Sequence, residues 1–204
     1  MESKPKPSFS IIIAINDQIA EVRSNLPLLL SQQYDDYEVI VVDESKTEES
    51  DEVLKLFKAE YKHLYNTFLP KYQFQKNRRR LAFTIGVKAA KKEWIVFTDI
   101  TTPPPSDQWL AELAAFTLET SVLFLGYINK KSGEVKLRDF GEIAQCSRLV
   151  TKTERERTSP KKRISLLWHK SSYDFIAVRA DMAHELLKLF ALDPRLLLNK
   201  EHKL

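Results

Sequence analysis

Short, almost continuous apolar runs recur through the first 130 residues of the chain. Residues 9–15, 37–42 and 94–98 are hydrophobic at nearly every position, which is typical of strands that are buried on both faces. Weaker runs at 64–69 and 121–128 predict two further strands. The pattern therefore indicates a sheet that is covered on both sides.

Apolar residues at helical spacing fill the intervals between these runs. A helix is expected from Ile19 to about Gln33, and Pro27 should kink it or delay its start. Thr47 should cap a second helix, residues 81–90 should form a third, and Ser106 should cap a fourth. The expected inner stripes are Val53, Leu54, Leu56 and Phe57 in the second helix and Trp109, Leu110, Leu113 and Phe116 in the fourth. Strands that alternate with helices in this way predict an α/β fold, with a mostly parallel central sheet and helices on both faces.

The pattern weakens after residue 130. Ser132-Gly133 indicates a turn between short strands, residues 139–150 indicate a helix, and the charged segment 151–163 indicates a mobile loop. Residues 173–178 and 180–191 predict a last strand and a last helix. No segment is repeated, and we expect one domain over residues 1–204.

Composition narrows the class of partner. The net charge is only +4, from 32 basic and 28 acidic residues, whereas nucleic-acid-binding domains carry a concentrated basic footprint. The basic run Lys161-Lys162-Arg163 has no interleaved aromatic residues, so we rank a nucleic-acid-binding protein last among the alternatives. Only four glycines occur, and none has the spacing of a dinucleotide fingerprint or a phosphate-binding loop.

The compartment is also predicted from composition. The single cysteine, Cys146, cannot form an intramolecular disulfide, which favours a reducing compartment. The first eight residues lack the apolar region of a signal peptide, and no stretch approaches the roughly 20 apolar residues that span a bilayer. We therefore expect a cytoplasmic protein, one that can also make peripheral contact with the cytoplasmic face of a membrane.

Acidic residues follow the three clearest strands. They lie in Asn16-Asp17, Asp43-Glu44-Ser45 and Asp99-Ile100-Thr101, and parallel strands bind ligands beyond their carboxyl ends. The arginines 78–80 come just before the third helix, and carboxylates beside guanidinium groups suit a metal-bridged diphosphate. Simpler roles compete with this interpretation: Asp43 can cap a helix, and the arginines can form a solvated face.

The order of these motifs resembles the family 2 inverting glycosyltransferases, which have the GT-A fold. The similarity extends over residues 9–130, including the acid pair at 43–44, the helix Gly86-Val87-Lys88-Ala89-Ala90-Lys91, and the strand before Asp99 with its following prolines and Trp109-Leu110. The helix is closest to bacterial members, which suggests a role in cell-surface polysaccharide synthesis. The resemblance implies a nucleotide-sugar-binding half at 9–130 and an abbreviated acceptor-side region at 131–204.

The resemblance also implies roles for single residues. Ala14 and Asn16 would lie against the nucleoside, Asp43 and Glu44 would meet the base, classically uracil, and Arg79 would approach the base or diphosphate. Asp99 would bind the ribose or sugar-diphosphate, and Thr101 takes the place of the metal-binding aspartate. The implied partners are a UDP-sugar donor, a weakly held Mn²⁺ or Mg²⁺ at Asp99 and Thr101, and a glycan or lipid-linked acceptor.

Two departures from the family pattern leave a second hypothesis open. Thr101 offers a neutral hydroxyl where a hard cation prefers a carboxylate, and no later acid pair supplies a catalytic base, so the catalytic residue is unknown. The chain is therefore either a glycosyltransferase or a related module that binds a nucleotide sugar or a protein without turnover.

Overall fold

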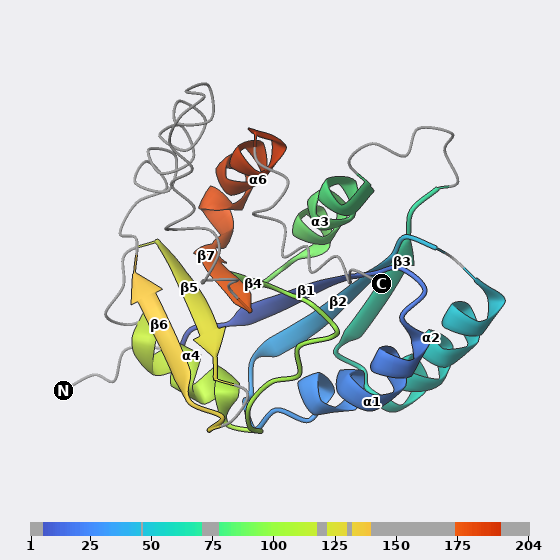
Figure 1. Cartoon of the computed structure of the whole chain (residues 1–204), viewed down its shortest axis with the longest axis horizontal. Helices are drawn as coiled ribbons and strands as arrows, with labels where there is room; N and C mark the ends of the chain where they lie inside the picture. The colour runs from blue at the N-terminus through green and yellow to red at the C-terminus, as the bar shows by residue number, and fades with distance from the viewer. Residues whose placement is uncertain are drawn as a thin grey trace, which may run out of the picture.

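The computed structural model describes residues 6–45, 47–70, 78–117, 122–129, 132–139 and 174–192. These residues form a seven-stranded sheet in the order β3-β2-β1-β4-β7-β5-β6 (Figure 1). The strands are β1 (Phe9–Ile15), β2 (Tyr37–Asp43), β3 (Leu64–Phe68), β4 (Trp94–Thr98), β5 (Leu123–Ile128), β6 (Val135–Asp139) and β7 (Phe175–Arg179). The helices are α1 (Ile19–Leu30), α2 (Glu48–Glu60), α3 (Arg78–Ala89), α4 (Trp109–Thr117), the 3₁₀ turn η1 (Ala180–Met182) and α6 (Ala183–Leu192).

The sheet has a parallel half and an antiparallel half. Strands β3, β2, β1 and β4 run parallel, as the apolar runs predict, and β1 lies between β2 and β4. Strand β7 is antiparallel to both β4 and β5, and β6 is antiparallel to β5. The α/β class is confirmed, but the expectation of a mostly parallel sheet holds only for the first half. The difference has two causes: β7 inserts between β4 and β5 in the opposite direction, and β6 follows β5 through a short hairpin, which forces those two strands to run in opposite directions.

Helices cover both faces of the sheet, as expected. In Figure 1, α1, α2 and α4 lie below the strands, whereas α3 and α6 lie above them. Alternate residues of β1 point to the two layers: Ile11 and Ile13 join the cluster formed with α1, α2 and α4, and Ile12 joins the cluster formed with α3 and α6. A Cβ on Gly86 would lie 2.4 Å from Ile12 Cγ2, so glycine allows α3 to approach β1 closely.

Most predicted elements are present, with three local corrections. Helix α1 begins at Ile19 and continues through Pro27, so proline does not delay its start. Leu56 is 69% exposed, because it lies off the stripe that Val53 and Leu54 set on α2. Ser106 lies three residues before α4, so its hydroxyl accepts from Gln108 N at 3.2 Å ahead of the helix, and within the first turn the N–H of Leu110 donates to Gln32 Oε1 at 3.2 Å.

The later segments agree with their predictions where the structure describes them. Thr47 caps α2, and its hydroxyl accepts a hydrogen bond from Ser50 N at 3.1 Å. Gly133 has a φ of 71° in the turn between β5 and β6, where that angle favours glycine. The predicted helix after Asp139 and the predicted loop at 151–163 lie outside the described residues. Among the helices in the described ranges, none is long and apolar enough to cross a membrane.

Candidate functional site

The carboxyl ends of the parallel strands bring the predicted site residues to one rim of the sheet. The β1–β2 register places Ile15 opposite Asp43, and the β1–β4 register places Ile13 opposite Thr98, the residue before Asp99. Asp43 and Asp99 therefore lie on the same rim, on either side of the end of β1. The structure confirms that placement, which the three apolar runs predict.

Asp43 holds together the loop that follows β2. Its Oδ1 accepts hydrogen bonds from Ser45 N and Ser45 Oγ, both at 2.8 Å, and its Oδ2 accepts one from Ser50 Oγ at 2.5 Å. The capping role of the helix is taken by Thr47, so Asp43 stabilises the loop and the first turn of α2 together. The carboxylate is buried, and its contacts fix the backbone that carries the next residue, Glu44.

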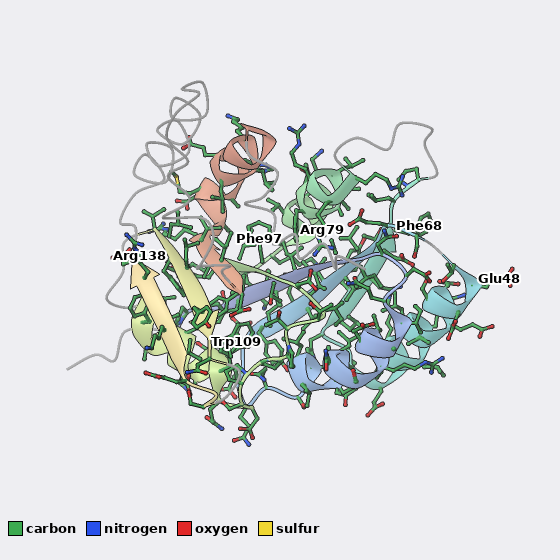
Figure 2. All side chains as sticks on the ribbon, viewed as in Figure 1. Glu48, Phe68, Arg79, Phe97, Trp109 and Arg138 are labelled. Atoms are coloured by element: carbon green, nitrogen blue, oxygen red, sulfur yellow. The ribbon has the colours of Figure 1, made fainter. Side chains whose placement is uncertain are left out.

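Arg79 joins the three strand ends. From the first turn of α3 it reaches across the rim, where Nη1 donates to the Ala14 carbonyl at 2.9 Å and Nη2 donates to Asp99 Oδ2 at 2.5 Å. Its Nη1 also lies 3.9 Å from Glu44 Oε1, and its guanidinium lies 5.5 Å from the centre of the Phe83 ring. Figure 2 shows Arg79 between α3 and the strands. Four predicted site residues are thus in one cluster: Ala14, Glu44, Arg79 and Asp99.

Glu44 is a buried acid with an unsatisfied oxygen. Within the described part of the chain, Glu44 Oε1 has no hydrogen-bond partner, although Arg79 lies nearby. Arg78 also contacts Glu44, because its Nη2 donates a hydrogen bond to the backbone carbonyl oxygen of Glu44. Burial raises the pKa of the Glu44 carboxyl above its ordinary value, and the two arginines lower it only in part.

The pKa of Glu44 gives a test of this environment. Because the pKa of Glu44 is raised in the folded state, folding favours the protonated carboxyl. The protonated carboxyl therefore contributes fully to the free energy of unfolding below about pH 4.5, and this contribution is lost as pH rises through the raised pKa. Glu44→Gln cannot ionise, so the variant should gain stability relative to the wild type as pH rises, and the gain should then level off. Urea unfolding of both proteins across this range measures the difference. A difference that does not change with pH would contradict the assigned environment.

Asp99 and Thr101 bind each other rather than an open coordination site. Asp99 Oδ1 accepts from Thr101 N at 2.9 Å and from Thr101 Oγ1 at 2.8 Å, while Oδ2 faces Arg79. No group of three or more His, Cys, Asp or Glu side chains that could hold a metal occurs among the described residues. Because a hard cation requires several oxygen ligands, this donor set does not fit a preformed divalent-metal site.

Two further residues complete the rim. Asn16 is exposed just beyond β1, and its backbone N–H donates to Gln18 Oε1 at 3.3 Å. Asp174 was not predicted: it is buried beside the end of β4, and its Oδ2 accepts from Ile128 N at 2.8 Å. Its carbonyl accepts from Thr98 Oγ1 at 3.3 Å. An acid before an apolar run is the only signal in the sequence, and the antiparallel direction of β7 that brings it to the rim is not visible there.

The family can now be assigned by comparison. A model of glycosyl transferase family 2 matches residues 10–186, which include the whole sheet except Phe9 and all the site residues above. The chain belongs to glycosyl transferase family 2. No curated protein shows significant sequence similarity to it.

Solved structures agree with the GT-A fold of this family member. A mannosyltransferase, PcManGT from Pyrobaculum calidifontis, in complex with GDP-Man and Mn²⁺, has a TM-score of 0.58 at 12% identity over 90% of this chain and 47% of its own. TarS 1–349 from S. aureus has a TM-score of 0.50 at 21% identity over 58% of this chain and 34% of its own. The chain thus spans a third to a half of the length of these two proteins.

Proposed function

We propose that the rim binds a nucleotide-diphosphate sugar and that the chain transfers the sugar to a hydroxyl group of a glycan or lipid-linked acceptor. The observation that carries this proposal is the Arg79 cluster, which places a guanidinium group and two acids at the ends of three strands. Family membership supports the same activity. The mannosyltransferase of similar fold was solved with GDP-Man, a donor of the proposed class.

The proposed nucleotide is uridine diphosphate. Glu44 Oε1 is a buried acceptor without a hydrogen-bond partner in the described structure, and a base that presents an N–H group would satisfy it. Uracil offers such a donor at N3. Ala14 and Asn16 would then lie against the nucleoside, with Asp43 holding the loop from which Glu44 points.

Transfer in this site would be an in-line displacement at the anomeric carbon. The acceptor oxygen forms a bond to that carbon, the bond from the carbon to the diphosphate oxygen breaks, and its electron pair leaves with the nucleoside diphosphate. The hydroxyl proton passes to a general base. Arg79, which Asp99 holds at the rim, would stabilise the negative charge that develops on the leaving group.

Nucleotide binding tests the proposal directly. UDP at 100 times its dissociation constant should stabilise the protein by about 2.7 kcal/mol, because a ligand that binds only the native state shifts the unfolding equilibrium. Asp43→Ala should abolish the shift, since the loop that carries Glu44 loses its three hydrogen bonds. Asp36→Ala is a matched control, because Asp36 immediately precedes the first residue of β2, at the end of the strand opposite to Asp43, and pairs with Lys92. An equal shift in all three proteins would place the nucleotide elsewhere.

A second candidate function is binding without transfer. It is favoured by one observation: Asp43, Asp99 and Asp174, the buried aspartates of the rim, are each engaged with groups of the chain itself. An acid held in this way is a poor general base. Release of UDP from UDP-sugars, assayed on the same samples as UDP binding, separates the two functions, because a binding module would show the thermal shift without any release.

A further inference from the structure

The cation position of the family's donor site is altered in this chain. A divalent cation at Asp99 would need at least one free carboxylate oxygen and further hard ligands. Both oxygens of Asp99 are already paired, Oδ1 with Thr101 and Oδ2 with Arg79. A cation that displaced neither group would lie beside a guanidinium of the same charge.

A positive charge is nevertheless present at this position. The Arg79 side chain is 19% exposed, and two hydrogen bonds and the Phe83 ring hold it in place. A guanidinium remains charged at any accessible pH and has five N–H donors in a fixed plane. Ala14 accepts from Nη1 and Asp99 accepts from Nη2, so two of these five donors are used and the group retains further N–H groups on both nitrogens.

We propose that Arg79 takes the place of the divalent cation, so that this chain binds the diphosphate of its donor without metal. The inference rests on the proposed function, since it concerns the same donor site. Asp99 then serves as the anchor of Arg79 rather than as a metal ligand, and Thr101 serves as the anchor of Asp99. Threonine suits that role because its hydroxyl and N–H both donate to Asp99 Oδ1.

Calorimetry with UDP and uridine tests the proposal on the full chain. In the wild type, the dissociation constant of UDP should agree within about twofold between EDTA and MnCl₂. Arg79→Met should raise the dissociation constant of UDP by at least about tenfold, because one charge-assisted contact is lost. The dissociation constant of uridine, which has no diphosphate, should change by no more than about twofold. Arg80→Met is the matched control: Arg80 is the next residue of α3, forms no ion pair within the described structure, and should leave both affinities unchanged.

A gain of metal dependence gives an independent test. Thr101→Asp adds a second carboxylate beside Asp99 and removes the hydroxyl donor, so Mn²⁺ should strengthen UDP binding by this variant about tenfold or more. If the wild type bound UDP only in the presence of Mn²⁺, the role of Arg79 would be overturned, whereas the proposed function would stand. Equal weakening of uridine and UDP by Arg79→Met would overturn the role of Arg79 as well. No binding of uridine or UDP in either buffer would instead overturn the proposed function, and this proposal with it.

Discussion

Phe175→Ala should lower the free energy of unfolding by about 3–5 kcal/mol, the range measured for large-to-small changes of buried aromatic residues. Phe175 is fully buried at the start of β7, and its ring packs edge-to-face against Trp109 of α4 at a centroid distance of 5.1 Å. The side chain thus joins the antiparallel half of the sheet to the helical layer beneath it. Urea unfolding followed by circular dichroism measures the change.

Gly126 of β5 lies directly against the ring of Phe175. A Cβ on Gly126 would lie 1.9 Å from Phe175 Cζ, so Gly126→Ala alone should destabilise the fold by about 1–3 kcal/mol through overpacking. In the Phe175→Ala background the same methyl group enters the space left by the ring. Gly126→Ala should then cost little or should stabilise the variant, and the two changes should be strongly non-additive.

A distant core residue provides the control for this cycle. Val53 is buried on α2, which packs on α1 and β3 at the other end of the sheet. Val53→Ala should add to Phe175→Ala within about 0.5 kcal/mol, because the two sites share no contact. If Gly126→Ala were also additive, the close approach of Gly126 to the Phe175 ring would be wrong.

The parallel half of the fold is predictable from the sequence because burial on both faces leaves a continuous apolar run. Strand β1, FSIIIAI, is fully buried, and its neighbours β2 and β4 have the same character. The antiparallel half is harder to predict. Strand β6, VKLRD, is half exposed, and β7 inserts between β4 and β5 although it comes much later in the chain. Long-range insertion of this kind leaves no local pattern.

The site was predictable only in part, for a related reason. Strand-end acids such as Asp43 and Asp99 follow from the parallel register, and both lie on the rim as expected. The residue pattern alone does not show which of the arginines 78–80 reaches Asp99, and only the family resemblance singles out Arg79. Helical geometry separates their directions by about 100° per residue, so only the start of α3, set by tertiary packing, selects Arg79.

The second large effect concerns the ion pair that orients this arginine. Asp99→Ala should lower the free energy of unfolding by about 3 kcal/mol, the low end of the range for breaking a buried pair. The low end applies because the side chains of Asp99 and Arg79 are still 11% and 19% exposed. The substitution leaves the Arg79 guanidinium with the Ala14 carbonyl and a Glu44 oxygen 3.9 Å away. Arg79→Met should cost less, since Asp99 then retains both hydrogen bonds from Thr101.

The double variant isolates the coupling between the two charges. Asp99→Ala with Arg79→Met should be more stable than the sum of the single effects predicts, by about 1–3 kcal/mol, because neither Asp99 nor Arg79 then remains without the other. The surface pair Asp36–Lys92, with side chains 58% and 27% exposed, should have a coupling energy of about 1 kcal/mol or less in the same kind of double-mutant cycle. Additive single effects at Asp99 and Arg79 would mean that the pair contributes no more than a surface contact. A large coupling would mean that Asp99 fixes the guanidinium before any donor binds, which is the preorganisation that a cation substitute requires.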